Sequence, residues 1–513
     1  MKDYLQKILK ARVYDVAKET PLERAKILSK RFNNNIYLKR EDLQDVFSFK
    51  IRGAFNKMRN LSKSQLEKGV ITSSAGNHAQ GVALSALKLK SNATILMPIT
   101  TPLVKIKAVK ELKAEVILYG ESYDESYLEA LRLSEERNLT FIHPFDDPDV
   151  IAGQGTIAVE IISQLGDPPD SIYVAIGGGG LIAGISIYIK NLWPQTKIIG
   201  VEPIDANAMS RSLKENKIIE LDNVGLFADG VAVKKVGKLT FEITKKYVDK
   251  IITVNNDEIC AAIKDVFEDT RSILEPAGAL SIAGMKKDIN ESNCINNNFV
   301  AIACGANMNF ERLRFVAERA ELGEYKEAML AVEIPERAGS LINLCELLKK
   351  RNLTEFSYRM SNSEIAQIFI GLEVNGSYDK KKLIEEFIKS KYNFIDISND
   401  ELSKNHLRHM VGGRLPLGFT NLNSSNLVEI LYRFEFPERP GALMKFLKNM
   451  KPDWSISVFH YRNHGSDVGR IVIGILINKN NLEDWFEFVQ ELGYKYWDES
   501  NNQTYKLFLG AST

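Results

Sequence analysis

Short apolar runs alternate with longer amphipathic segments over residues 35–320. One set of apolar runs lies at residues 36–40, 69–74, 93–99, 114–120 and 140–145. A second set lies at residues 171–177, 197–203 and 299–305. Strands that are apolar throughout and separated by helices are typical of parallel sheets with helices on both faces. The pattern therefore predicts an α/β body.

The pattern changes after about residue 327 into two copies of one module. The sequence IPER at 334–337 returns as FPER at 436–439, and FSYR at 356–359 returns as FHYR at 459–462. Each copy has the pattern of a strand, a tight turn, an amphipathic helix and two further strands, which predicts two related modules. A duplicated module appended to a larger α/β body favours a paired ligand-sensing unit over a purely structural extension, because allostery needs two distinct sites. Arg359 and Arg462 recur at equivalent positions, so neither copy is singled out.

Composition excludes several classes of partner. The 513 residues hold 67 Lys and Arg against 66 Asp and Glu, a net charge of +1, so no basic surface for nucleic acid or membranes is expected. The four cysteines form no CxxC pair, which argues against a zinc site or a disulfide framework and for a reducing, cytoplasmic setting. Residues 173–189 carry no charge, but a run of four consecutive glycines interrupts them and they are too short to cross a membrane.

The first candidate site is the sequence SFKIRGA at residues 48–54, which follows KRED at 39–42. We expect Ser48 to cap a helix through the following residues, with Lys50 in its first turn. The positive end of the helix dipole and partial burial both favour a neutral amine there. Lys50 is therefore a candidate for a Schiff base with a carbonyl group.

Two loops are candidate anion sites. The sequence SSAGNHAQG at 73–81 stands between a predicted strand and a helix, where small residues let backbone N–H groups face a carboxylate. His78 in this loop is a weaker candidate, since a lone histidine beside a helix start is more often structural. Four consecutive glycines at 177–180 follow a strand and open a helix, which favours a bound phosphate.

The glycine loop also fits the sequence pattern of a second class of enzyme. Gly178, Gly180 and Ala183 match the GxGxxA pattern of dinucleotide-binding enzymes, and Glu202 ends the next predicted strand. An NAD-dependent dehydrogenase therefore stays open as an alternative. An amino-acid sensor with an inactive body is a second alternative, suggested by the duplicated modules.

The last block is ACGAN at 303–307, after an apolar strand. Cys304 is either a small buried hydrophobe or a weak donor to an aromatic nitrogen. Glu275 precedes Pro276 at a probable helix start, where capping and a cofactor role are both open.

In this order and spacing the four blocks resemble the threonine and serine dehydratase family of fold-type II pyridoxal-phosphate enzymes. The similarity covers roughly residues 15–320, and the duplicated tail is similar to that of the biosynthetic branch, which carries two ACT-like regulatory modules. The resemblance implies a two-lobed catalytic body over residues 1–325 with the small lobe at about 45–145. It further implies ACT-like modules at 327–400 and 425–511.

The resemblance also implies residue roles. Lys50 forms the Schiff base with pyridoxal 5'-phosphate, Phe49 lies beside the ring, Asn77 bonds the ring oxygen, and Cys304 faces the pyridine nitrogen where most relatives have serine. The phosphate is expected on Gly177, Gly178, Gly179, Gly180 and Leu181. The substrate carboxylate is expected on Ser74, Gly76 and His78. Ala75 stands where related serine racemases carry a second serine, which favours elimination over racemisation.

The implied reaction is deamination of L-threonine to 2-oxobutanoate and ammonia, the first step towards isoleucine, with L-serine as a second candidate substrate. The implied effector is isoleucine, with valine as a second candidate, acting through the modules. A homotetramer is expected, with no metal.

Overall fold

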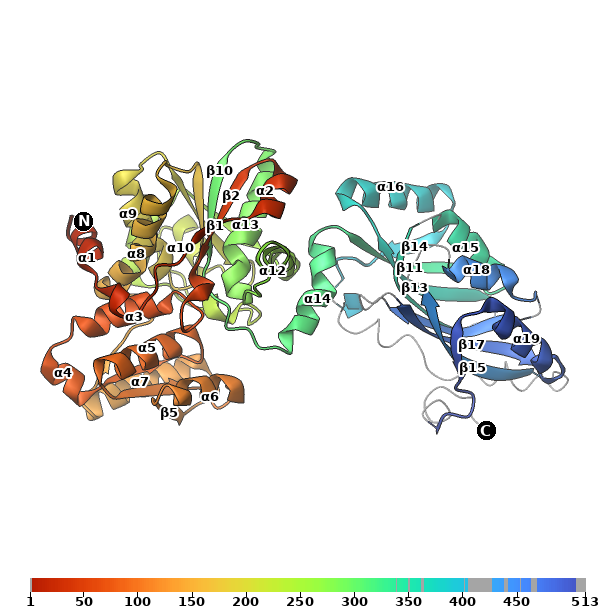
Figure 1. The fold of residues 1–513 in the computed structure, drawn as a ribbon, viewed down its shortest axis with the longest axis horizontal. Helices are drawn as coiled ribbons and strands as arrows, with labels where there is room; N and C mark the ends of the chain where they lie inside the picture. Colours follow the sequence, from red (N-terminus) through yellow and green to blue (C-terminus); the bar gives the residue numbers. More distant parts are fainter. Residues whose placement is uncertain are drawn as a thin grey trace. The chain divides into compact units, whose positions relative to one another are not determined.

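The computed structural model describes residues 2–337, 339–348, 351–360, 364–400, 402–404, 427–437, 442–452, 454–462 and 468–503. The chain divides into two compact units, Met1–Gly323 and Glu324–Thr513 (Figure 1). Each unit is described by itself.

A six-stranded sheet forms the large lobe of the first unit. In spatial order its strands are β1 (Leu22–Arg24), β2 (Asn35–Arg40), β10 (Asn298–Ala303), β7 (Ser171–Ala175), β8 (Lys197–Pro203) and β9 (Lys250–Val254). Only β1 is antiparallel to its neighbour. The helices α8 (Pro148–Leu165) and α9 (Gly180–Leu192) lie on one side, and α12 (Asn256–Thr270) and α13 (Pro276–Ser292) on the other (Figure 1). Because β7 and β10 are covered on both faces, their residues are almost all buried.

A four-stranded parallel sheet forms the small lobe. Its strands in spatial order are β5 (Glu115–Leu118), β4 (Ala93–Met97), β3 (Val70–Ser73) and β6 (Thr140–Phe141). Its helices are α3 (Lys50–Arg59), α4 (Lys63–Lys68), α5 (Asn77–Leu89), α6 (Leu103–Glu111) and α7 (Tyr123–Glu136). The predicted fold class, parallel sheets covered by helices in two lobes, is confirmed.

The remaining elements of this unit are short or peripheral. The helices are α1 (Lys2–Lys10), α2 (Lys26–Phe32), α10 (Ala208–Lys214), α11 (Lys238–Tyr247) and α14 (Arg312–Gly323). Three single 3-10 turns are η1 (Val13–Asp15), η2 (Glu41–Leu43) and η3 (Asp229–Val231).

A fully buried ion network anchors the start of α3. The Arg52 guanidinium donates to both carboxylate oxygens of Glu41, at 2.8 Å each, and to Glu160 at 2.6 Å. Lys39 donates to Glu160 at 2.5 Å. Because every charge in the network has an opposite charge in contact, burial is tolerated. Lys39 and Glu41 of the KRED sequence therefore serve to hold the helix that begins with Lys50.

One continuous antiparallel sheet of eight strands forms the second unit. The first copy contributes β11 (Glu327–Pro335), α15 (Ser340–Leu348), β12 (Leu353–Arg359), β13 (Ile365–Glu373), α16 (Gly376–Lys389) and β14 (Asn393–Asp396). The second contributes β15 (Leu427–Pro437), α18 (Ala442–Asn449), β16 (Ser455–Arg462), β17 (Val468–Asn478), η6 (Lys479–Asn481), α19 (Leu482–Leu492) and β18 (Lys495–Asp498). The copies join where β12 pairs with β16.

The repeat is thus larger than the sequence pattern predicted, since each copy ends in a second helix and a further strand. The predicted limits of the second module, 425 and 511, lie outside the described residues, as do 438 and 439 of its FPER sequence. Arg359 is buried and forms an ion pair with Glu429 of the other copy, whereas Arg462 is partly exposed. Arg359 therefore links the two copies.

Candidate active site

Lys50 is the first residue of α3, but Ser48 does not cap this helix. Phe49 occupies the N-cap position without a side-chain cap, and the Ser48 hydroxyl is buried with no hydrogen-bond partner in the described part of the chain. The expected cap is wrong because Ser48 pairs with Gly305 in an isolated antiparallel bridge. A long-range backbone contact thereby replaces the local one.

The half-buried Lys50 amine makes a hydrogen bond to the backbone. Its Nζ donates to the carbonyl oxygen of Pro144 at 3.2 Å. Burial lowers the pKa of Lys50 to about 8, although the nearby Cys304 and Glu275 act in the opposite direction. At pH 7 about a tenth of the amine is then neutral, far more than for a lysine with an ordinary pKa. The neutral form is the one that attacks a carbonyl.

Asn77 begins α5 directly after the loop that follows β3. Its Nδ2 donates to Glu275 Oε1 at 2.5 Å, and its Oδ1 accepts from Asn307 Nδ2 at 2.6 Å. In the same loop a Cβ at Gly76 would meet no atom within 4 Å, so its backbone borders open space. The loop thus has room for a ligand beside its N–H groups.

Ser74 and His78 of this loop have other partners. The Ser74 hydroxyl accepts from the backbone N–H of Gly76 at 3.3 Å. The buried His78 ring contacts the Ile142 carbonyl through Nε2 at 3.0 Å. Burial lowers the pKa of His78 to about 3, so the ring is neutral. These contacts favour the structural role for His78 that the sequence left open.

The glycine loop opens α9, and no side chain of the described residues caps this helix. Gly179, at the N-cap, has a φ of 94°, which favours glycine. The first N–H groups of a helix have no intrahelical acceptor, so an uncapped start next to small residues can receive an anion. A Cβ at Gly178 would lie 2.2 Å from the Phe145 ring, which makes glycine necessary at that position too.

Cys304 directly follows β10, and its backbone contacts Phe49, the residue before Lys50. The Phe49 N–H donates to the Cys304 carbonyl at 3.2 Å. The buried thiol donates to the Ala277 carbonyl at 3.4 Å, and burial raises its pKa. The thiol is therefore neutral.

Glu275 precedes α13 at its N-cap position, but its side chain does not cap the helix. Instead its carboxylate accepts a hydrogen bond from Asn77. It also lies near the backbone of Gly230, since a Cβ added at Gly230 would be 3.7 Å from Glu275 Oε1. Burial raises the pKa of Glu275 to about 7, and the charge of Asp229 acts in the same direction. Glu275 therefore does not cap α13, and its side chain contacts Asn77, a candidate site residue, instead.

Two observations support the fit of these residues to a pyridoxal phosphate. The segments that carry Lys50 and Asn77 hold buried polar atoms without a partner among the described residues, namely Ser48 Oγ, Ser73 Oγ and His78 Nδ1. The site also combines a half-buried amine of lowered pKa, a helix start without a side-chain cap, and a neutral thiol. Lys50, Asn77, the 177–181 loop and Cys304 are the residues that would hold the cofactor.

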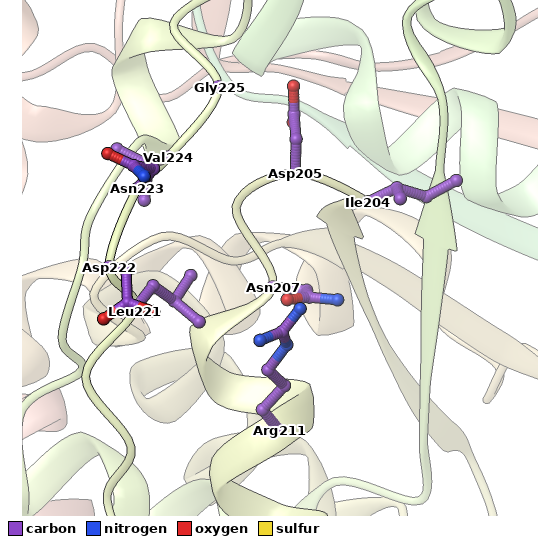
Figure 2. A pocket seen from close by; sticks show the side chains of 9 residues that line it. All are labelled: Ile204, Asp205, Asn207, Arg211, Leu221, Asp222, Asn223, Val224 and Gly225. Carbon is purple, nitrogen blue, oxygen red and sulfur yellow. The ribbon is translucent and has the colours of Figure 1, made fainter.

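The structure does not support the dinucleotide alternative. The buried Glu202 carboxylate accepts from the N–H groups of Met209 and Ser210, so it is not available to a ribose. A cavity of about 400 Å³ lies beyond β8 (Figure 2), between α10 with Arg211 and the loop 221–225. Neither Glu202 nor the glycine loop lines this cavity. The GxGxxA match is therefore incidental.

Sequence reasoning assigned no role to three features of the site. Phe145 packs on the glycine loop, and Asn307 bonds Asn77. Asp229 accepts from Lys105 of the small lobe at 2.6 Å and pairs with Arg312 of the large lobe at 3.3 Å. A polar residue just after a parallel strand is a known signal for binding sites, which could have indicated Asn307.

The described residues contain no cluster of three or more metal-ligating side chains. Among the same residues no helix is long and apolar enough to span a membrane.

The site belongs to the class of pyridoxal-phosphate dependent enzymes, whose family model matches residues 13–305. A second model, for the C-terminal regulatory domain of threonine dehydratase, matches residues 318–407 and 422–509. A biosynthetic L-threonine dehydratase of Burkholderia multivorans is 53% identical over 510 residues, 99% of each chain. One from Pasteurella multocida is 48% identical over 99% of this chain and 97% of its own. This chain belongs to the biosynthetic threonine dehydratase family.

Solved structures agree in fold. The processed form of threonine deaminase isoform 2 from Solanum lycopersicum has a TM-score of 0.62 and 53% identity, and the match covers 63% of this chain and 88% of that one. Maize serine racemase has a TM-score of 0.58 and 30% identity, covering 61% and 96%.

Proposed function

We propose that this chain deaminates L-threonine to 2-oxobutanoate and ammonia, as the first step of isoleucine biosynthesis. The observation that carries the proposal is the Lys50 amine, which is half-buried, has a pKa lowered to about 8, and donates to the carbonyl oxygen of Pro144, the residue before the Phe145 that packs on the glycine loop. Family membership supports the same reaction, because the relatives are named for it.

The chain's residues divide the work between binding and proton transfer. Lys50 would hold the cofactor, and its neutral amine would remove the proton from the substrate α-carbon. The N–H groups of the 177–181 loop bind the phosphate, and the loop with Ser74 and Gly76 takes the substrate carboxylate. The bound cofactor supplies an electron sink for the carbanion. Cys304, whose thiol is neutral, would face the pyridine nitrogen without enforcing its protonation, and this would favour prompt loss of the β-hydroxyl.

A ketoacid assay tests the reaction. The purified protein should release 2-oxobutanoate from L-threonine, and the assay with L-serine measures how well the site accepts the smaller substrate. Lys50→Ala should abolish release, whereas Lys63→Ala, at an exposed lysine of α4, should leave it unchanged. Full activity in Lys50→Ala would refute the proposal. Absence of ketoacid from the wild-type protein would favour the inactive amino-acid sensor.

Isoleucine is the effector we propose, with valine as the second candidate, and a cavity between the two modules supports its placement. The cavity measures about 420 Å³ and takes its lining from both copies. Apolar side chains are supplied by Leu341 and Ile342 of the first copy and Trp454 of the second. Glu336, which accepts from the Tyr358 hydroxyl, supplies polar groups. Isoleucine combines a branched apolar side chain with a charged ammonium group and a charged carboxylate group. This combination matches the apolar and polar lining of the cavity.

Two variants test the effector site. Leu341→Trp fills the cavity, and Arg337→Gln removes an exposed cation from its edge. Both should raise the isoleucine concentration that halves the activity, with little change in activity without isoleucine. The control Arg314→Gln lies on an exposed position of α14 and should leave inhibition as in the wild type. Unaltered inhibition in both cavity variants would exclude this cavity.

A homotetramer in the cytoplasm completes the proposal. Light scattering of the purified protein tests the oligomeric state, and a mass other than four times 57.8 kDa would exclude the tetramer. Free Cys260, Cys294, Cys304 and Cys345 are compatible with a reducing compartment.

A further inference from the structure

The side chain of Asn307 connects two segments that both carry site residues. Its Nδ2 donates to the carbonyl oxygen of Val46 at 2.8 Å and to Asn77 Oδ1 at 2.6 Å. Val46 lies four residues before Lys50 in the chain. One amide group therefore contacts the segment that leads to the amine and the side chain expected at the cofactor ring.

The Val46 carbonyl sets the direction of this hydrogen-bond chain. A carbonyl oxygen only accepts, so the Asn307 atom that faces it must be the NH₂ group. Because the same NH₂ group contacts Asn77, Asn77 must present its oxygen to Asn307. The Asn77 NH₂ group then faces Glu275 Oε1 at 2.5 Å. One of its two N–H bonds is used there, and the second is left for a ligand.

Backbone bonds place Asn307 in a continuous strip along the Lys50 segment. The Phe49 N–H donates to the Cys304 carbonyl at 3.2 Å, and the Ala306 N–H donates to the Phe47 carbonyl at 2.8 Å. The side-chain bond from Asn307 to Val46 extends this pairing by one more contact. Movement of Asn307 would consequently reach both cofactor-binding segments.

We propose that Asn307 is a positioning residue, which fixes the Asn77 amide so that it donates a hydrogen bond to the ring oxygen of pyridoxal phosphate. With the amide reversed, Asn77 would present an acceptor to an acceptor, which disfavours binding. The inference rests on the proposed function, because it needs the cofactor in this site.

Asn307→Asp tests the orientation directly. A carboxylate cannot donate to Val46 or Asn77, so Asn77 turns its NH₂ group towards residue 307 and its oxygen towards Glu275 and the cofactor. Glu275, whose pKa is raised to about 7, can take up the proton that this orientation needs. The dissociation constant of pyridoxal phosphate should rise roughly 10- to 100-fold. The pH midpoint of the visible band of the bound cofactor should also shift, by at least about half a pH unit. Asn307→Ala frees Asn77 without reversing it and should give smaller changes in both.

Asn34→Asp is the matched control. Asn34 Nδ2 also donates to two carbonyl oxygens, of Phe32 at 2.7 Å and Cys294 at 2.9 Å. Asn34 lies beside the first residues of β2 and β10, at the opposite end of these strands from the site. Loss of these two hydrogen bonds in Asn34→Asp should lower the melting temperature but leave the cofactor affinity and the spectral midpoint unchanged.

The outcomes separate the two claims. A spectral shift in Asn307→Asp that is absent from Asn34→Asp supports the positioning role. If neither variant changes the midpoint or the cofactor affinity, the positioning role is overturned and the proposed function stands. A wild-type protein without any cofactor band at Lys50 overturns the proposed function itself.

Discussion

The lowered pKa of Lys50 predicts how fast the apoenzyme captures pyridoxal phosphate at different pH values. With a pKa of about 8, the amine is about half neutral at pH 8.0 and nearly all neutral at pH 9.5, so the capture rate should rise only about twofold. An ordinary lysine amine near 10.5 would gain roughly 30-fold over the same interval. The two cases differ by more than tenfold.

The assay is stopped-flow absorbance at low cofactor concentration. Each rate is divided by the rate for Nα-acetyl-lysine amide at the same pH, which cancels the titration of the cofactor itself. Circular dichroism at each pH checks that the protein stays folded. A capture rate that rises in parallel with the reference amine up to pH 9.5 would refute the lowered pKa.

Glu275→Gln tests the electrostatic part of the argument. The Glu275 charge raises the pKa of Lys50, and the larger effect of burial opposes it. Removing that charge should therefore move the midpoint of the rate profile below pH 8. Glu215→Gln, at an exposed position, is the control and should leave the midpoint in place. A midpoint that moves upward in Glu275→Gln contradicts the assignment.

Three further substitutions have expected outcomes. Arg52→Met leaves the buried Glu41 and Glu160 with too little positive charge and should cost about 3–5 kcal/mol of stability, seen as a lower melting temperature; an unchanged melting temperature would contradict the network. Gly179→Ala places a side chain at a φ of 94° and within 3 Å of neighbours, so reconstitution should show cofactor affinity about tenfold or more below wild type; equal affinity is the contrary result. Asp229→Asn weakens the contact between the lobes and should raise the KM for threonine about fivefold with little change in kcat; steady-state kinetics with an unaltered KM would speak against it.

The sequence supported the prediction of elements whose signals are local. Apolar runs at β3, β7 and β10 and the glycines before α9 follow from chain spacing alone, and the repeat follows from self-similarity. The order of strands in each sheet depends on contacts between distant segments, so periodicity did not reveal it. The added helix and strand of each module have no counterpart among the matched blocks.

The site shows the same division. The glycine loop was found from local context, because four consecutive glycines are unusual by themselves. Lys50 was singled out by its flanking residues, since a lysine in a helix is usually a solvated residue. The Ser48 cap failed because the bridge to Gly305 is a tertiary contact. The contact of Glu275 with Asn77 joins residues 198 positions apart, and no local pattern announces it. Tertiary contacts thus decide the roles that propensity leaves open.

The central claim is that Lys50 carries the cofactor that deaminates threonine. Borohydride reduction of the active enzyme, followed by digestion and mass spectrometry, tests it most directly. We predict a pyridoxyl group on the peptide that contains Lys50, together with loss of 2-oxobutanoate formation in proportion to its occupancy. A label on another lysine, or full threonine deamination after complete reduction at Lys50, would contradict the account.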